Sequence, residues 1–344
     1  MEKIFLIIAI LSFSSLFAQT RKAGIDGAAF LKVGVGARQV GIGSAATSLS
    51  EDVLNMYWNP AGIALKEEQS QASFTYNSWI AGLKQNAFAG SMNFDGIGTL
   101  GIGFMSFGIS GIPADRDYFP NDPALSAIQI DKNGSSTYDY LDMVVQLSYA
   151  HNISDQLSLG ATVKVISEKI DDQHASALAF DFGSLYHIGI LNWNIGARMN
   201  NLGGDLTFYD YGSPIPLTFS IGTSMIPISF SQHTFMIALD AVKPQDGQQY
   251  YYGGVEYGFN NILFLRGGWK FNYSYSGQRM LQGGIDEGTS DPNRGTIRTS
   301  LERGSLGAGV KTNVEGYWIG VDYAYTLFDK LDNVHRITLH IATR

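Results

Sequence analysis

The glycine-rich stretch GVGARQVGIG, residues 34–43, is the first part of the sequence that could bind a ligand. Glycines allow backbone N–H groups to come close to a phosphate. However, the stretch lacks both the Gly-Lys-Ser/Thr ending of a phosphate loop and the third glycine of the dinucleotide pattern. Close packing of this backbone against another part of the chain explains the glycines better, and we expect no cofactor.

The sequence does not support a metal-binding site either. The six histidines show no His-x-x-x-His or Glu-x-x-His spacing that would suit zinc. DKNGSS, residues 131–136, and DEGTSDPNRG, residues 286–295, carry oxygen ligands that could hold calcium in a loop. Neither fits the calcium-loop spacing, and turn chemistry explains their Asp, Asn and Gly residues. We therefore predict no metal site, with loop-bound calcium as the less favoured alternative.

Catalytic arrangements are not recognisable either. Acidic pairs such as Asp171 and Asp172 lack a partner that could complete a cleft, and no Ser/His/Asp set can be identified by spacing. The net charge of -8 argues against an extended nucleic-acid surface. The sequence thus predicts a protein that is not an enzyme and does not bind nucleic acid.

The N-terminus predicts export. Lys3 precedes an apolar run over residues 4–17, and Ala18-Gln19 follows as a small-residue cleavage site. The run is shorter than the roughly 20 apolar residues of a transmembrane helix. The chain has no cysteine, which excludes disulfides and a lipid anchor on cysteine. We interpret residues 1–18 as a cleavable signal peptide of a bacterial envelope protein.

The composition of the remaining chain favours β structure. It is rich in glycine and aromatic residues, with 40 Gly, 18 Tyr and 20 Phe, and only 16% of its residues are charged. A typical soluble domain has roughly 25% charged residues. These values fit either a soluble β protein or a membrane β-barrel.

Alternating hydrophobicity runs through most of the chain after residue 70. In LTFSIGTSM, residues 217–225, Phe219 and Ile221 alternate with Ser220 and Gly222. We count 14 such segments, most of them about 10 residues long, as a tilted strand crossing a bilayer requires. The segments are 71–79, 84–94, 97–109, 138–151, 157–170, 176–187, 190–199, 216–226, 233–243, 250–259, 262–273, 304–313, 316–327 and 335–343.

The connections and the charged residues separate the two β architectures. Two connections, 110–137 and 274–303, are long and most others are short, which is the outer-membrane pattern. Charged residues lie on the faces opposite the apolar ones, where a barrel has its lumen and a soluble sandwich its solvated face. Signal peptide, strand length and loop asymmetry together favour the barrel. We predict an all-β fold, with residues 71–344 forming a 14-stranded antiparallel barrel in contact with outer-membrane lipid. The charged lumen positions are Asp142, Lys164, Glu168, Asp181, Asp240, Glu256, Arg266, Lys270, Lys311, Asp322 and Arg336.

Residues 19–70 do not alternate and are predicted to form a hatch, or plug, within the lumen. Ser48 to Glu51 could cap a helix in EDVLNMYW, residues 51–58, which has apolar residues at helical spacing. Pro60 then stops that helix and favours an extended Asn59. The glycines and alanines of this segment allow close packing against a glycine-rich wall.

This segment also carries a family resemblance. Residues 30–65 resemble the N-terminal signature of the PorV/PorQ family of outer-membrane proteins, which is related to the FadL transporters of hydrophobic compounds. The closing segment NVHRITLHI, residues 333–341, is similar to the family's last strand, although the chain ends in IATR where an aromatic residue is common. The matching features are Gly36-Ala37-Arg38, the glycines 41 and 43, the pair Glu51-Asp52, and Asn59-Pro60-Ala61-Gly62.

The resemblance implies a structural or gating role for Arg38, Asn59, Pro60, Ala61 and Gly62 in the hatch. It also implies two functions. One is a component of type IX protein secretion that engages secreted proteins carrying a C-terminal sorting domain, or other components of the secretion system. The alternative is a FadL-like transporter that moves a hydrophobic small molecule across the outer membrane. The sequence identifies no ligand-binding residues for either.

Overall fold

The computed structural model describes residues 25–64, 70–114, 137–247, 249–272, 302–328 and 331–343. The predicted signal peptide, the two possible calcium loops and the last residue of the chain lie outside these ranges. Within them, no helix has the length and apolar character needed to cross a membrane.

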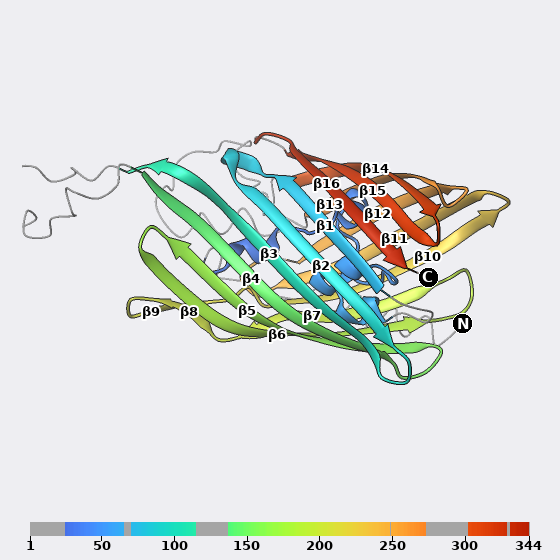
Figure 1. Ribbon diagram of the computed structural model, residues 1–344, viewed down its shortest axis with the longest axis horizontal. Coiled ribbons are helices and arrows are strands. Elements are labelled where there is room, and N and C mark those ends of the chain that lie inside the picture. The colour runs from blue at the N-terminus through green and yellow to red at the C-terminus, as the bar shows by residue number, and fades with distance from the viewer. Residues whose placement is uncertain are drawn as a thin grey trace, which may run out of the picture.

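Fourteen antiparallel strands close into one barrel, which confirms the predicted fold and strand count. Each strand pairs with its neighbours in the chain, and β1 pairs with β16 to close the wall (Figure 1). The barrel strands are β1 (Ser70–Ser78), β2 (Lys84–Phe94), β3 (Gly98–Pro113), β4 (Thr137–Asn152), β5 (Leu157–Ile170), β6 (Gln173–His187), β7 (Asn194–Gly203), β10 (Thr218–Phe230), β11 (His233–Pro244), β12 (Tyr250–Phe259), β13 (Leu263–Asn272), β14 (Glu302–Val314), β15 (Tyr317–Phe328) and β16 (Val334–Thr343).

The two ends of the barrel differ. At the end where β1 begins and β16 ends, the connections are short, for example 231–232 and 315–316. The opposite end carries the long connections after β3 and β13 and a separate hairpin of β8 (Asp205–Phe208) and β9 (Tyr211–Pro214). In outer-membrane barrels the long loops face outward. We therefore call this the outer end and the other the inner end.

Side chains alternate between lipid and lumen as the sequence predicts. Ile221 is 42% exposed on the outer surface, whereas Ser220 beside it is fully buried inside. Asp142, Arg266 and Asp322, which the sequence placed on the lumen face, are also buried inside the barrel. The alternation follows because successive side chains of a strand point to opposite faces.

One predicted strand was placed wrongly. The segment expected at 190–199 begins only at Asn194, because Leu191 and Asn192 adopt positive φ angles of 56° and 46° in a turn. Ile188 and Trp193 close this turn with a backbone hydrogen bond of 2.8 Å. Tertiary context therefore shifted this boundary by four residues, and β7 continues to Gly203.

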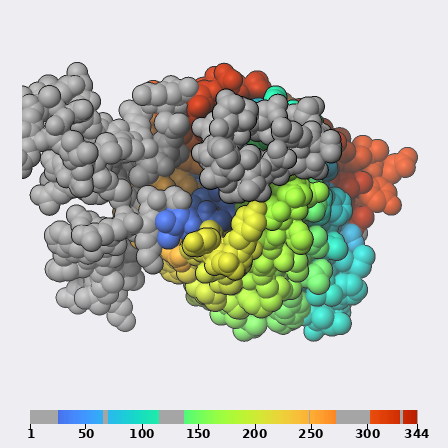
Figure 2. All heavy atoms as spheres, turned by 90° about the vertical axis from the view of Figure 1, so that its left-hand side faces the viewer, coloured from blue at the N-terminus to red at the C-terminus, as the bar shows by residue number. Residues whose placement is uncertain are grey.

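Residues 25–64 lie inside the barrel. They form four short helices, η1 (Ala29–Lys32), α2 (Ala37–Gly41), η2 (Val53–Tyr57) and η3 (Pro60–Ile63). Seen onto the outer end, this blue segment lies within the mouth of the barrel (Figure 2). α2 contacts β13 to β16, η2 contacts β1 to β3, and η3 contacts β4 to β6, so the segment touches the wall on several sides. We refer to residues 25–64 as the plug.

Candidate functional site: the contact between plug and wall

Asn59 makes three hydrogen bonds, one to the wall and two within the plug. Its side-chain amide donates to the carbonyls of Thr47, at 2.7 Å, and of Ser184 on β6, at 3.0 Å. Its Oδ1 accepts the backbone N–H of Ala61 at 3.1 Å and so caps η3. Asn59 is extended, as expected, with φ −116° and ψ 109°. The preceding helix ends at Tyr57, and Asn59 also begins a second short helix that the sequence did not indicate.

The cap of the preceding helix also differs from the prediction. Asp52, and not Ser48 or Glu51, caps η2, because its Oδ1 accepts the N–H of Leu54 at 2.9 Å. Pro60 then occupies the first position of η3, where a missing N–H costs nothing. The chain therefore makes two successive 3-10 turns where the sequence indicated a single helix.

The wall opposite this element approaches the plug backbone very closely. A β-carbon added at Gly183 on β6 would lie 1.9 Å from Asn59 Oδ1, and one at Gly160 on β5 would lie 2.4 Å from the Ala61 nitrogen. Gly62 is equally confined, since its β-carbon would lie 2.6 Å from the Leu49 carbonyl oxygen. Only glycine leaves room at these positions, which explains the glycine content of both surfaces.

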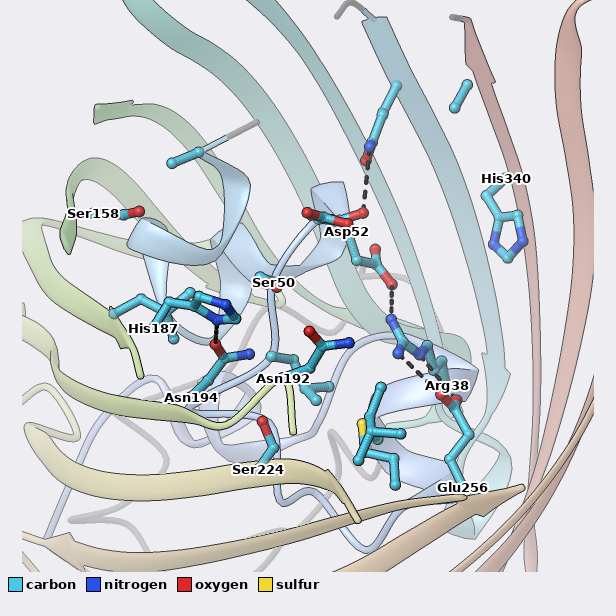
Figure 3. A pocket seen from close by; sticks show the side chains of 18 of the residues that line it. Arg38, Ser50, Asp52, Ser158, His187, Asn192, Asn194, Ser224, Glu256 and His340 are labelled. Carbon is cyan, nitrogen blue, oxygen red and sulfur yellow. Dashed lines mark hydrogen bonds and ion pairs between the residues drawn. The ribbon is translucent and has the colours of Figure 1, made fainter. Parts of the chain in front are cut away.

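Arg38 forms the main charged contact between plug and wall. Its Nε and a terminal nitrogen donate to the two carboxylate oxygens of Glu256 on β12, each at 3.0 Å. Asp52 lies 3.9 Å away on the other side, so that Arg38 sits between two carboxylates (Figure 3). The charge of Glu256 raises the pKa of the Arg38 guanidinium despite its burial. Bidentate pairing of this kind strengthens the interaction and also holds the two side chains in a defined geometry.

Two further wall residues continue this contact across the barrel. Arg266 Nε donates to Glu256 Oε2 at 2.6 Å, and its terminal nitrogen donates to Asp322 at 2.5 Å. His340 lies 3.5 Å from Asp322. The sequence placed Glu256, Arg266 and Asp322 on the lumen face but could not show that Arg38 reaches them.

The plug residue Thr47 makes polar contacts that sequence reasoning missed. Its N–H donates to Asp240 on β11 at 2.9 Å, and Arg198 on β7 donates to its hydroxyl at 3.0 Å. On the adjacent wall, Lys164 pairs with Asp181 at 2.6 Å. The charged lumen positions therefore include both plug contacts and wall pairs, and alternation alone cannot distinguish them.

Tyr57 anchors the plug on another side. Its hydroxyl lies 2.6 Å from the Phe88 carbonyl on β2 and 2.9 Å from the Phe104 carbonyl on β3. Its single proton can be donated to one of them at a time. Burial raises the pKa of this hydroxyl, so it stays protonated and able to donate. Helical spacing placed Tyr57 among the apolar residues of this segment, but the sequence did not indicate that its hydroxyl reaches the wall.

At the outer end, the plug makes both aromatic and charged contacts. Phe30 stacks on Phe107 with ring centroids 6.5 Å apart, and Tyr140 meets Phe107 edge-on at 6.4 Å. Lys32 contacts Asp26 at 3.0 Å and also pairs with Asp246, which follows β11. Partial burial would lower the pKa of Lys32, but the bonds to Asp246 and Asp26 outweigh it and raise the pKa. The outer part of the plug is therefore held by an aromatic contact on one strand and an ion pair beside another.

A cavity of about 430 Å³ lies at the inner end, between the plug and the wall. Its lining includes Arg38 and Glu256 together with His187, Asn194 and His340 (Figure 3). His187 and Asn194 hydrogen-bond each other at 2.7 Å. The lining mixes polar and apolar side chains. Over the ranges that the structure describes, no three His, Asp or Glu side chains group in a way that could hold a metal ion.

The predicted motif residues therefore divide into two contacts. Asn59, Pro60, Ala61 and Gly62 face β5 and β6, whereas Arg38 faces β12. No contact joins Arg38 to Asn59 in the described structure. Both contacts fix the plug to the wall, and neither contains a nucleophile or a cofactor cradle.

Comparison with known proteins supports the fold alone. No protein-family model matches the sequence, and no curated protein matches it. Solved structures of FadL-family outer-membrane channels do resemble it. The toluene transporter TodX of Pseudomonas putida matches with a TM-score of 0.55 and 11% identity, over 90% of this chain and 97% of that one. A TodX variant and CymD, both described as monoaromatic hydrocarbon channels, match 90% of this chain with TM-scores of 0.56 and 0.54, each at 12% identity, over 98% and 96% of their own lengths.

Proposed function

We propose that this protein is a plugged outer-membrane channel for small hydrophobic molecules, the FadL-like alternative of the sequence analysis. The plug seated across the lumen, in a barrel of the same fold as hydrocarbon channels, carries this proposal. In this proposal Arg38 and the Asn59 to Gly62 element hold the plug, the predicted signal peptide directs export, and lipid of the outer membrane surrounds the barrel.

The contacts that hold the plug suit a part that moves. The barrel strands hydrogen-bond one another around the whole circumference, so the wall does not need the plug to satisfy its backbone. The plug is held by individual side-chain contacts, such as Arg38 with Glu256 and Thr47 with Asp240. Each contact contributes on the order of 1 kcal/mol, and charged ones somewhat more. Their loss would release the plug without opening the barrel.

The type IX secretion hypothesis has no comparable support. Its partner contacts were expected on the outer loops, and the two long loops lie outside the described residues. None of the comparisons points to a secretion component. We therefore take the transporter as the proposed function.

A reversible lock on the plug tests this proposal. A β-carbon added at Gly41 in α2 would lie 3.4 Å from Gly307 Cα on β14, and one at Gly307 would lie 3.2 Å from Gly41 Cα. These separations suit a disulfide bond. The chain has no cysteine of its own, so the double variant Gly41→Cys, Gly307→Cys would carry a single possible crosslink.

Uptake of radiolabelled toluene should be measured in cells whose outer membrane contains lipopolysaccharide and lacks other such channels. Uptake should be present in the reduced double variant and both single variants, and absent in the oxidised double variant. Equal uptake in both redox states would overturn plug movement. Absence of uptake by the unmodified protein, for toluene and for larger hydrocarbons, would overturn the channel.

A further inference from the structure

Three lumen-facing residues form a row across the outer half of the wall. Phe107 on β3 is the register partner of Asp142 on β4, and Asp142 is the register partner of Glu168 on β5. The row therefore places an aromatic ring, a carboxylate and a second carboxylate side by side. Tyr140, one lumen position further out on β4, hydrogen-bonds Asp142 Oδ2 through its hydroxyl.

The two carboxylates lack compensating cations. Asp142 is fully buried, and its Oδ1 has no hydrogen-bond partner. Neither Asp142 nor Glu168 has an ion-pair partner among the residues that the structure describes. A buried carboxylate oxygen without a donor is costly, and a neighbouring like charge adds to that cost. This row could therefore accept a hydrogen-bond donor or a positive charge that the described part of the chain does not supply.

A phenyl ring of the plug packs against the Phe107 end of this row. Phe30 is almost completely buried and stacks on Phe107, which the Tyr140 ring meets edge-on. Phe30 offers the aromatic part of a suitable occupant but has no group for the Asp142 oxygen. The Phe30 ring therefore fills space in the site, whereas Asp142 Oδ1 is left without a hydrogen-bond donor.

The segment that carries Phe30 is held in a strained conformation. Ala28, next to η1, has φ 49° and ψ 40°, a left-handed conformation that is strained for a residue with a β-carbon. The N–H of Gly27 is tied to the Pro214 carbonyl at 3.0 Å, and the Ala28 backbone hydrogen-bonds Glu168. Strain of this kind is typical of clamps and switch segments.

We propose that Phe30 occupies a binding site for an aromatic ligand that carries a protonated amine. The ring of the ligand would take the place of the Phe30 ring against Phe107 and Tyr140, and its ammonium group would donate to Asp142 and Glu168. Binding would displace Phe30 and relieve the strain at Ala28, which couples occupancy to release of the plug. This inference rests on the proposed function, and it specifies that the channel prefers aromatic amines over hydrocarbons.

Fluorine NMR of the purified full-length protein in micelles tests the site directly. The probes are 4-fluorobenzylamine, 4-fluorotoluene and 4-fluorobenzoate, which share a ring and differ in charge. Phe30→Ala should bind the amine more than about tenfold more tightly than the unmodified protein, because the competing side chain is gone. Ile63→Ala, which truncates another buried plug side chain beside β3, is the matched control and should leave affinity unchanged.

Asp142→Asn in the Phe30→Ala background should weaken amine binding about tenfold while leaving 4-fluorotoluene binding unchanged. Equal affinity of Phe30→Ala for the amine and for 4-fluorotoluene would overturn the assigned ligand class. An equal gain in Ile63→Ala would overturn the site. The NMR experiment measures binding and does not require transport. Its outcome is therefore independent of the outcome of the toluene uptake test.

Discussion

Replacing Asn59 by alanine should release the plug while leaving the barrel intact. The substitution removes the cap on η3 and the two hydrogen bonds to the Thr47 and Ser184 carbonyls. Loss of an Asn cap costs about 1 kcal/mol. Each of the other two buried bonds contributes about 1 kcal/mol. The cap and the bond to Thr47 lie within the plug, and only the bond to Ser184 crosses to the wall. The plug should therefore be held less firmly by about 1 kcal/mol, which corresponds to a roughly fivefold rise in the released population.

Conductance in a planar bilayer measures that population, because an unobstructed 14-stranded barrel has room for water. Asn59→Ala should open roughly five times more often than the unmodified protein. Ser148→Ala is the matched control, since this buried hydroxyl hydrogen-bonds the Thr162 hydroxyl at 2.7 Å and both residues belong to the wall. It should not raise the conductance.

A substitution in the wall tests the contact between Asn59 and β6. An alanine at Gly183 would place its β-carbon 1.9 Å from Asn59 Oδ1, so Gly183→Ala should also release the plug. Combined with Asn59→Ala it should add less than it does alone, because the closest colliding atom is gone and only Pro60 Cδ, at 2.9 Å, remains in the way. The reasoning fails if Asn59→Ala stays as closed as the unmodified protein, or if the two effects simply add.

Three further outcomes are expected. Deletion of residues 24–65 should convert a silent protein into one with steady open-channel current, and unchanged current on deletion would place this segment outside the barrel. Ile221→Arg should destabilise the folded barrel by roughly 2–4 kcal/mol in a urea titration if it lies near the bilayer midplane, whereas Ser220→Ala, which removes an unpartnered hydroxyl, should change little. Glu256→Met should cost about 2–3 kcal/mol in the same titration, because Arg38 loses both bonds of its bidentate pair and Arg266 keeps only Asp322. Arg38→Met should lower the free energy of unfolding by less than Glu256→Met does, since Glu256 keeps its bond to Arg266. Equal losses of stability in the two variants would contradict this prediction.

The strands of this protein could be predicted because their signal is local. Each lumen or lipid position follows from the two-residue period, so Ser220 and Ile221 were assigned to their faces without knowledge of any neighbour. The bounds of β2, β5 and β12 agree with the prediction at both ends. The start of β7 was wrong because the turn before it contains Leu191 and Asn192 in conformations that a hydrophobic pattern does not reveal.

The contacts of the plug depended on the closed tertiary structure. The sequence indicated Arg38 and Asn59 as residues of interest but could not indicate their partners, because Arg38 and Glu256 are 218 positions apart. Only closure of β1 on β16 sets which lumen residue faces which part of the plug. The contact between Gly183 and Asn59 could not be predicted either, because the two residues come close only after the barrel has formed. The period of a strand determines which way a side chain points, and the circumference and stagger of the closed wall determine what it meets.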